Sequence, residues 1–521
     1  MAWYDEAVFY HIYPLGLCGA PALNDYGEPQ PRLRKLRPWI EHIRSLGCTA
    51  LYIGPLFESV GHGYETTDYR RLDARLGTNE ELRDFVRLCH EAGLRVVFDA
   101  VFNHTGRDFF AFRDLRERRE QSPYRDWYCG VSFGGNNSFN DGFSYENWGG
   151  YDLLAKLNLR NPAVREYLLD TVRFWVSEFD VDGLRLDAAD VLDFDFMRAL
   201  RRTTDALKPD FWLMGEVIHG DYARWANAEM LHSVTNYHLH KALYSAHNEH
   251  NYFEIAHTVQ RQEELRERGI RLYSFADNHD VERIWSRLRN KAHYLPLHVL
   301  LYTLPGIPSI YYGSEFGIEG RKERGSDAAL RPCLELAALE RRENPCAELI
   351  AALGRIHARE TALARGGYRQ LGLTTTQYAF SRGDLLVTVN NAESPALFDL
   401  PGEGRYRGAL GGGELDAENG RLRPELPACG AEIWIPLSEQ RPQYEPLRER
   451  IESAPSMPEA VPAIPERAPQ GKAYEQMSVE ELQAEILAKL ASNGPVTDRM
   501  RREVRENVYP DSLLNWVKSF R

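Results

Sequence analysis

Several features that would direct a protein to a membrane or to nucleic acid are missing from this chain of 521 residues. No apolar run approaches the roughly 20 residues that a membrane span needs. The first residues show no basic stretch followed by an apolar one, so we predict no signal peptide. Acidic residues outnumber basic ones by 76 to 63, which gives a formal charge of −13, and no basic stripe stands out. Nucleic acid and an anionic membrane are therefore not expected as partners.

Cysteine is scarce, and no two cysteines form a CxxC pair. An odd, scattered set of this kind indicates reduced thiols in a cytoplasmic protein, where they serve as small packing residues. The seven cysteines are Cys18, Cys48, Cys89, Cys129, Cys333, Cys346 and Cys429.

A GxGxxG pattern after the first apolar run is also missing, which disfavours a doubly wound sheet that binds a dinucleotide. What the chain has instead is a series of eight strand-like runs, rich in β-branched and aromatic residues, that begin at Val8, Ala50, Arg95, Gly183, Phe211, Ser233, Leu272 and Ser309. Helical patterns separate most of them, among others at Arg34–Ser45, Asn79–Glu91, Pro162–Glu178 and Phe194–Leu207. Eight such units predict an α/β fold of the (β/α)8 TIM-barrel type, with the doubly wound sheet as the alternative.

Changes in composition divide the chain into further parts. Residues 1–103 and 158–362 would form the barrel, and residues 104–157, rich in Gly, Asn and aromatics, an insertion domain after the third strand. We expect most of these aromatic residues to form the insertion's own core and a few to contact a substrate. Residues 363–437 read as short antiparallel strands of a β-sandwich, and residues 438–472 as a Pro-rich linker.

Residues 473–521 are predicted to form a short helical tail. A capping box at Ser478–Glu481 would open a helix at Glu480–Ala491, and two more helices are expected at Thr497–Asn507 and Asp511–Phe520. The tail has no residues that suggest chemistry. It suits docking or homo-oligomerisation as well as packing against the barrel.

Four acidic residues follow four of the strand-like runs: Asp99, Asp187, Glu216 and Asp280. The carboxyl ends of barrel strands converge on one face, so these side chains are expected in one pocket. A carboxylate there is costly to desolvate unless it is used or paired. With arginine and histidine neighbours, the set points to acid/base and nucleophilic chemistry on a neutral, polar substrate.

The motifs around these residues resemble those of the α-amylase superfamily, glycoside hydrolase family 13, over about Val8 to Leu437. They are DAVFNH ending at His104, GLRLD ending at Asp187, GEV around Glu216 and FADNHD ending at Asp280, in the family's order. GIPSIYYGSE from Gly306 is similar to its eighth-strand motif, and His62-Gly-Tyr64 to the loop that places a tyrosine under the sugar.

One stretch of the sequence indicates a subfamily. LAKLN, at Leu154–Asn158, is similar to a marker of cyclomaltodextrinases, neopullulanases and maltogenic amylases. This implies a retaining hydrolase of α-1,4-glucosidic bonds in maltooligosaccharides, cyclodextrins or related α-glucans. Those enzymes usually carry an N-terminal β-domain that builds their dimer, whereas here the first barrel strand begins near Val8, so their dimer is not implied.

The resemblance assigns roles to the candidate residues. Asp187 is the expected nucleophile; Arg185, two residues earlier on the same strand face, should lower its pKa and keep it ionised. Glu216 is the expected general acid/base, because the apolar FWLM before it favours the protonated form. Asp280 is the third carboxylate and would hold hydroxyls of the distorted glucose; it also suits the N-cap of a helix at Val281–Arg289.

The remaining candidate residues would bind the substrate or support the catalytic residues. The predicted substrate-binding residues are Tyr64, His62, His104, Arg185, His279 and His219. Asp99 and Asn103 are predicted to be supporting residues, with Asp99 orienting Arg185.

No cofactor is firmly predicted. The resemblance implies a structural calcium site built from Asn103 and from a histidine four residues after the nucleophile, but Val191 stands at that position and Asp190 replaces the usual lysine. We therefore predict that the usual calcium site is incomplete, although Asn and Asp residues of the insertion offer cation ligands elsewhere.

Two other functions are compatible with the scaffold. One is an α-glucosyl transferase or isomerase, of trehalose-forming or phosphorolytic type, in which a different acceptor reaches the intermediate. The other is a carbohydrate-binding relative without activity; such relatives lose the nucleophile or the acid, and this chain keeps both Asp187 and Glu216.

Overall fold

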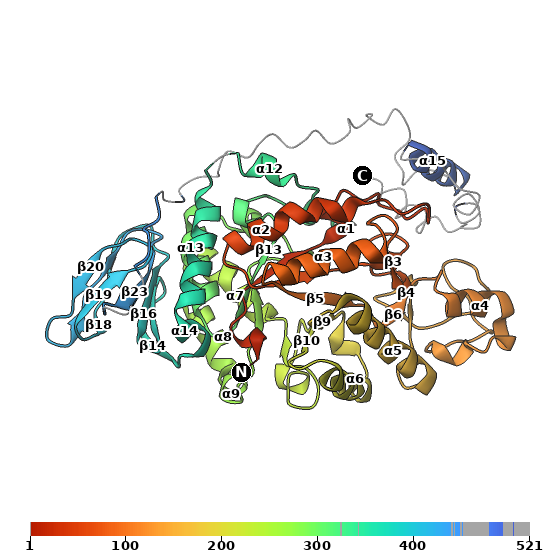
Figure 1. The fold of residues 1–521 in the computed structure, drawn as a ribbon, viewed down its shortest axis with the longest axis horizontal. Coiled ribbons are helices and arrows are strands. Elements are labelled where there is room, and N and C mark those ends of the chain that lie inside the picture. Colours follow the sequence, from red (N-terminus) through yellow and green to blue (C-terminus); the bar gives the residue numbers. More distant parts are fainter. Residues whose placement is uncertain are drawn as a thin grey trace.

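Eight parallel strands form the centre of the protein, which is described here by a computed structural model covering residues 2–323, 326–341, 343–438, 441, 443–448, 451, 479–492 and 504. Neighbouring strands follow the order β11-β10-β9-β5-β2-β1-β13-β12. A further parallel bridge joins Thr235, directly after β11, to Tyr273 of β12. This bridge closes the sheet, so the protein is a (β/α)8 barrel and the doubly wound alternative is excluded (Figure 1).

Each barrel strand coincides with one of the eight predicted apolar runs. The strands are β1 Phe9–Ile12, β2 Ala50–Ile53, β5 Arg95–Ala100, β9 Gly183–Leu186, β10 Trp212–Gly215, β11 Ser233–Val234, β12 Tyr273–Phe275 and β13 Ile307–Tyr311. Nearly all of their residues are buried, because helices cover the outside and side chains such as Phe9, Trp212 and Tyr273 fill the inside. Strands buried on both faces read as continuous apolar runs, which made them easy to recognise.

Helices surround the barrel. The longer ones are α2 Arg37–Ser45, α3 Asn79–Glu91, α5 Pro162–Phe179, α6 Phe194–Leu207, α7 Tyr237–Asn248, α8 Phe253–Arg261, α11 Tyr294–Thr303 and α13 Pro345–Arg359. The shorter ones are α1 Pro14–Leu17, α9 Glu263–Glu267, α10 Ile284–Arg287, α12 Leu336–Leu339 and α14 Thr361–Arg365.

Side-chain caps fix where several helices begin. Thr78 and Glu81 form a reciprocal capping box at α3, and Asn161 caps α5 by accepting a hydrogen bond from Ala163 N. The predicted bounds of α3 and α6 are confirmed. The helix expected from Arg34 begins only at Arg37, because the residues before it form a 3-10 turn, Arg32–Leu36.

Residues 104–157 form a small sheet and one helix beside the barrel. The elements are β6 His104–Thr105, α4 Phe110–Arg118, β7 Asn147–Trp148 and β8 Tyr151–Lys156, with the strands in the order β6-β8-β7. Five aromatic residues of this segment are buried, namely Phe109, Phe112, Tyr128, Phe143 and Tyr145. Trp148 and Tyr151, in contrast, are 40% and 60% exposed. Four more aromatic residues, Phe110, Tyr124, Trp127 and Phe133, are partly buried and pack against the same apolar cluster. Most aromatics of this segment are therefore core residues, as expected, but they share one core with the barrel and do not form a separate one. A hairpin of β3 Phe57–Ser59 and β4 Thr66–Leu72 precedes it in the chain.

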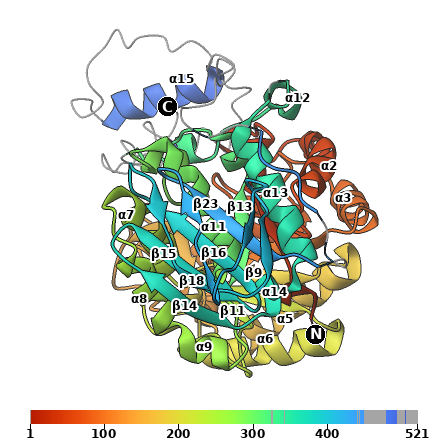
Figure 2. The ribbon, with the colours of Figure 1, turned by 90° about the vertical axis from the view of Figure 1, so that its left-hand side faces the viewer.

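The C-terminal part is an antiparallel β structure, seen from its own side in Figure 2. Its main sheet has the order β14-β15-β16-β23-β19-β20, and two short pairs, β17-β22 and β18-β21, complete it. The strands are β14 Tyr368–Leu373, β15 Gln377–Arg382, β16 Leu385–Asn390, β17 Ala396–Leu397, β18 Leu400–Pro401, β19 Arg405–Gly408, β20 Glu414–Asp416, β21 Arg421–Leu422, β22 Glu425–Leu426 and β23 Ala431–Pro436. Leu386 and Trp434 of the main sheet share an apolar cluster with Leu422 and Leu426 of the short pairs.

The buried guanidinium of Arg382 joins this sheet to the helices of the barrel. It donates hydrogen bonds to the carbonyl oxygens of Thr303 at the end of α11, at 2.6 Å, and of Leu363 in α14, at 2.5 Å. Burial lowers the pKa of Arg382 to about 9. These carbonyls lie near helix C-termini, where a cation is favoured.

In the tail, α15 Val479–Ser492 confirms the helix expected at Glu480–Ala491. Leu482 and Ile486, one turn apart, are buried within the single chain. The other two predicted tail helices and most of the predicted linker 438–472 lie outside the described residues, and the division of the chain into domains stays a prediction. Among the helices that the structure describes, none is long and apolar enough to cross a bilayer.

Candidate active site

Arg185 lies at the centre of a carboxylate cluster at the carboxyl ends of the barrel strands. Its Nη1 is 2.7 Å from Asp187 Oδ1 and 2.9 Å from Asp99 Oδ1, and its Nη2 is 2.9 Å from Glu216 Oε2. Asp99 belongs to β5, while Asp187 and Glu216 directly follow β9 and β10. One guanidinium therefore connects three of the four predicted carboxylates.

The backbone after Asp187 turns sharply. Ala188 adopts a left-handed conformation, with φ 46° and ψ 43°, which is strained for a residue with a side chain. The turn lets the Ala188 N–H donate to Glu216 Oε2 at 3.1 Å. Tyr237 Oη donates to the other Glu216 oxygen at 3.3 Å. Glu216 is thus held by the turn after β9 and by the first residue of α7.

Asp99, on β5, is held by hydrogen bonds from two tyrosines. Tyr52 Oη and Tyr64 Oη donate to its Oδ2 at 2.9 and 3.0 Å. Gly54 makes room for it, because a Cβ at position 54 would lie 2.2 Å from the Cβ of Asp99. This geometry agrees with a supporting role, in which Asp99 orients Arg185.

Asp280 completes the cluster from the loop after β12. His279 Nε2 lies 3.0 Å from its Oδ2, and Arg331 Nη2 lies 2.9 Å from its Oδ1. Desolvation opposes the charge of Asp280, yet His279 and Arg331 outweigh it and hold its pKa well below the ordinary value. The predicted N-cap role is wrong, because the helix in this region, α10, begins at Ile284, whose N–H donates to Asp277 Oδ2 at 2.7 Å.

The protonation of Asp187 also differs from the expectation. Burial is the largest effect and raises its pKa well above the ordinary value; Arg185 lowers the pKa, while Glu216 and Asp99 raise it. Arg185 alone would lower the pKa of Asp187, and the direction predicted from it is wrong for the free site. Physically, one guanidinium cannot compensate three carboxylates that share a desolvated pocket.

Tyr64 and two histidines lie around this cluster. The Tyr64 ring stacks on the His279 ring, with centroids 5.7 Å apart and an interplanar angle of 11°. The Asn103 amide lies 3.2 Å from His104 Nδ1 and donates to it, so the proton of the ring is on Nε2. That Nε2 is buried and has no partner among the described residues. Burial lowers the pKa of His104 to about 3, so the ring is neutral near pH 7.

Comparison with known proteins identifies the family. The model of the alpha amylase catalytic domain matches residues 36–364. The chain belongs to the alpha-amylase family. As a member of that family it is a glycoside hydrolase.

Two relatives and one solved structure lie within the predicted subfamily. A cyclomaltodextrinase from a Bacillus species is 31% identical over 75% of this chain and 73% of its own length. Neopullulanase 2 from Thermoactinomyces vulgaris is 30% identical over 83% of this chain and 78% of its own length. The structure of a cyclomaltodextrinase superposes with a TM-score of 0.74 at 26% identity, over 83% of this chain and 78% of that one. The predicted resemblance is confirmed.

Two histidines of this alpha-amylase family protein that were predicted to bind substrate, His62 and His219, are more exposed than the residues of the carboxylate cluster. The His62 side chain is 48% exposed, and its Nε2 lies 3.1 Å from Glu65. His219 is exposed in the loop after β10. Their contacts with a substrate stay predictions.

Four residues of the site escaped the sequence analysis: Tyr52, Tyr237, Asn278 and Arg331. Asn278 lies inside the FADNHD motif and donates to Tyr237 Oη at 3.2 Å, so the motif itself carried a signal for it. Arg331 lies outside every strand-like run, and no local pattern around it pointed to Asp280.

The predicted gap in the calcium site involves three residues. Asn103 uses its amide on His104, Val191 is 49% exposed, and Asp190 is exposed with a pKa raised by partial desolvation. Within the described ranges, no three His, Cys, Asp or Glu residues gather as ligands of a metal. Whether the protein needs calcium stays a prediction.

Proposed function

We propose that this protein is a retaining α-glucan hydrolase that cleaves α-1,4-glucosidic bonds of maltooligosaccharides, cyclodextrins or related α-glucans. The observation that carries the proposal is the bridge that Arg185 forms between Asp187 and Glu216, at 2.7 and 2.9 Å. Glycoside hydrolysis with retention needs two carboxyl groups close together, one as nucleophile and one as acid. The names of the relatives agree with this substrate class.

The reaction begins with the proton of the coupled pair on Glu216 and with Asp187 ionised and paired with Arg185 at 2.7 Å. In the first step the Glu216 carboxyl gives this proton to the glycosidic oxygen. An oxygen of Asp187 attacks C1, the C1–O bond to the leaving sugar breaks, and a covalent glucosyl ester forms. In the second step Glu216, now ionised, takes a proton from water. The water oxygen attacks C1 and releases Asp187. Because one guanidinium contacts both carboxylates, loss of the proton from Glu216 changes the environment of Asp187 directly.

The other predicted residues hold the sugar. Asp280, kept ionised by His279 and Arg331, would accept hydrogen bonds from its hydroxyls. His104 would donate from Nε2, and Tyr64 offers a ring face beside His279. His62, His219 and Arg185 would complete the binding site, while Asp99 and Asn103 keep Arg185 and His104 in place.

The experiment offers the purified protein β-cyclodextrin, maltotriose, pullulan and starch and separates the products by size. We expect glucose and maltose from the first two. Asp187→Ala should lower this activity by more than about 10³-fold, since loss of one stabilising donor alone costs 10²–10³. Asp195→Asn, an exposed aspartate of α6, is the matched control and should retain activity. Undiminished activity of Asp187→Ala would refute the proposal.

The transferase or isomerase alternative has no separate observation in its favour. Adding excess glucose tests it: products with new linkages in place of hydrolysis would support transfer as the main reaction. A location in the cytoplasm is supported by the seven cysteines, all of them free. Association of copies through residues 473–521 is tested by light scattering of the full chain beside a chain that ends at residue 472.

A further inference from the structure

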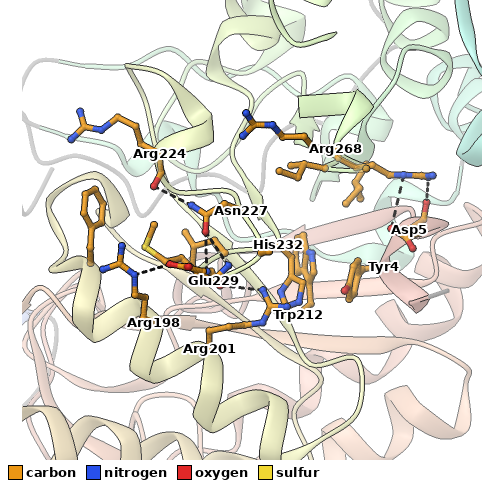
Figure 3. A pocket seen from close by; sticks show the side chains of 18 residues that line it. Tyr4, Asp5, Arg198, Arg201, Trp212, Arg224, Asn227, Glu229, His232 and Arg268 are labelled. Carbon is orange, nitrogen blue, oxygen red and sulfur yellow. Dashed lines mark hydrogen bonds and ion pairs between the residues drawn. The ribbon is translucent and has the colours of Figure 1, made fainter. Parts of the chain in front are cut away.

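A cavity of about 830 Å³ lies near the amino ends of the barrel strands, whereas the carboxylate cluster lies at their carboxyl ends (Figure 3). It is lined by Trp212, the first residue of β10, by Ile307, the first residue of β13, and by Tyr4 and Asp5, which precede β1. No residue of the catalytic cluster lines it. The catalytic carboxylates follow the carboxyl ends of the strands, so a ligand in this cavity would not occupy the glucan site.

Arginines dominate the wall of the cavity, with only Asp5 and Glu229 as acidic lining residues. The five arginines come from three segments: Arg198 and Arg201 of α6, Arg224 after β10, and Arg268 and Arg271 before β12. In the view of Figure 3, Arg224 and Arg268 lie on one side of the cavity and Arg198 and Arg201 on the other. A concave wall with an excess of positive charge concentrates anions.

The arginines are not all neutralised by acidic partners. Four of the five contact acidic side chains: Arg198 contacts Asp195 at 2.9 Å and Glu229 at 3.1 Å, Arg201 contacts Asp205 at 2.9 Å, Arg268 contacts Glu264, and Arg271 lies 3.9 Å from Asp5. Arg224, however, forms no ion pair with any described residue; its guanidinium lies over the Trp225 ring, 5.2 Å from the centroid. This leaves its planar donors available to a ligand.

Two further polar side chains of the wall, Tyr4 and His232, can donate hydrogen bonds. His232 Nδ1 accepts from Leu213 N at 3.0 Å, so the proton of its ring is on Nε2. Burial, with Arg201, lowers the pKa of His232 to about 3, which keeps the ring neutral. Burial raises the pKa of Tyr4 to about 12, so its hydroxyl keeps its proton. The Tyr4 and His232 rings lie side by side, with centroids 5.1 Å apart.

We propose that this cavity binds a small molecule that carries a phosphate monoester on a polar ring, such as a hexose phosphate or a mononucleotide. Guanidinium groups match phosphate oxygens in pairs of hydrogen bonds. The Tyr4 and His232 rings, with Met230 and Ile270, supply a surface for the ring of the ligand. The volume is that of a small-molecule site, which is typically about 300–1,000 Å³.

Isothermal titration calorimetry of the full-length protein tests this inference. The probes are glucose 6-phosphate, adenosine monophosphate, inorganic phosphate and glucose, each at millimolar concentration. We expect one site for at least one of the two monoesters, weaker binding of inorganic phosphate and none of glucose. The monoester that binds with the higher affinity shows whether the cavity prefers a sugar or a nucleoside as the ring of its ligand. Absence of binding by both monoesters would overturn the proposal, as would equal affinity for inorganic phosphate.

Two matched variants locate the site. Arg224→Gln should weaken the monoester about tenfold, the cost of one charge-assisted hydrogen bond. Arg202→Gln, on the exposed side of the same α6 that carries Arg201, should bind like the wild type. If Arg224→Gln is not folded by circular dichroism, Arg201→Gln takes its place. Equal weakening in the control would contradict the assignment.

Kinetics separates this inference from the proposed hydrolase. The monoester should leave the KM for maltotriose unchanged, because the two sites share no residues. A purely competitive effect would put the ligand in the glucan site and refute the inference, whatever the substrate of the enzyme proves to be. Binding to the inactive Asp187→Ala variant should be unaltered.

Discussion

Arg331 Nη2 lies 2.9 Å from Asp280 Oδ1, although 51 residues separate the two in the chain. Arg331 also donates from Nε to the carbonyl of His279 at 3.0 Å, so it fixes both the backbone and the carboxylate of this loop. The side chain of Arg331 is nearly buried, at 12% exposure. An ion pair in such a place is stronger than one on the surface.

Arg331→Gln should therefore raise the KM for maltotriose by about tenfold or more, the cost of one charge-assisted hydrogen bond. Arg331 lowers the pKa of Asp280, so its loss should raise that pKa. The acidic limb of the kcat/KM profile then moves to higher pH. Steady-state kinetics across the acidic range measures both effects. Arg341→Gln, at an exposed position, is the control; an unshifted limb in Arg331→Gln would contradict the role of Arg331.

Arg185→Lys should lower kcat by about 10² or more, because a single ammonium cannot contact three carboxylates as the guanidinium fork does. Circular dichroism checks that the variant is folded. Arg95→Lys, at the opposite end of the neighbouring strand β5, pairs with Asp182 and should keep near-normal activity. Normal turnover by Arg185→Lys would show that the bridge is not needed.

Proton NMR of the first product should reveal the α-anomer. The mechanism requires the carboxyl carbons of Asp187 and Glu216 to work at a separation of roughly 5–5.5 Å, which leaves no room for a water between nucleophile and C1. The spectrum is followed from the start of hydrolysis, before mutarotation mixes the anomers. Initial appearance of the β-anomer would exclude the covalent route.

Glu432 gives the C-terminal sheet a pH-dependent stability. Burial raises the pKa of its carboxyl to about 7, although Leu410 N, Gly411 N and Ile433 N donate hydrogen bonds to it. In the unfolded chain the pKa of a glutamate is about 4.3. The unfolded state therefore releases this proton first, and folding loses stability as pH rises from about 4.3 to 7, by about 4 kcal/mol in total.

In the wild type, the melting temperature should therefore fall as pH rises from 4.5 to 7.5. Glu432→Gln should remove this slope. Its melting temperature should also be lower at acidic pH, because the amide turns a donor toward one of the backbone N–H groups. Glu425→Gln, on the exposed face of β22, should keep the slope of the wild type. A slope that survives in Glu432→Gln would assign the pH dependence to another group.

Treatment with EDTA should leave both the melting temperature and the activity unchanged, because Val191 occupies the position of the usual calcium-binding histidine. Differential scanning fluorimetry with and without added calcium measures this. A large drop after EDTA, reversed by calcium, would show that other ligands, such as carbonyls and acids of the insertion, hold the ion.

The barrel was predictable because its strands are buried on both faces. A strand such as β5, with Val96, Val97 and Phe98 in a row, can only lie between a filled barrel interior and a helix layer. The four carboxylates, Asp99, Asp187, Glu216 and Asp280, were predictable together with Arg185, because charged residues near the ends of such buried runs are rare without a function. Helices with clear caps, α3 and α6, were predicted to the residue.

What escaped prediction depends on contacts between distant segments. Nothing near Arg331 or Tyr237 in the sequence indicates that the first contacts Asp280 and the second Glu216. The direction of the Asp187 pKa shift was wrong for another reason: a shared pocket was expected, but only Arg185 was weighed, whereas burial is the largest effect and Glu216 adds to it. The cap assigned to Asp280 failed because Asp277 and Asn278 bind the local N–H groups instead.

Gly54 makes the site vulnerable at a position that takes no part in the reaction. A single methyl group there would overlap the Cβ of Asp99 at 2.2 Å and would press against the Asp99 backbone N at 3.0 Å. Neither atom can withdraw, because Asp99 belongs to a barrel strand. Natural variants that lose activity with all acids, arginines and histidines intact are therefore to be sought at this glycine, and directed evolution of the protein should leave codon 54 out of its libraries.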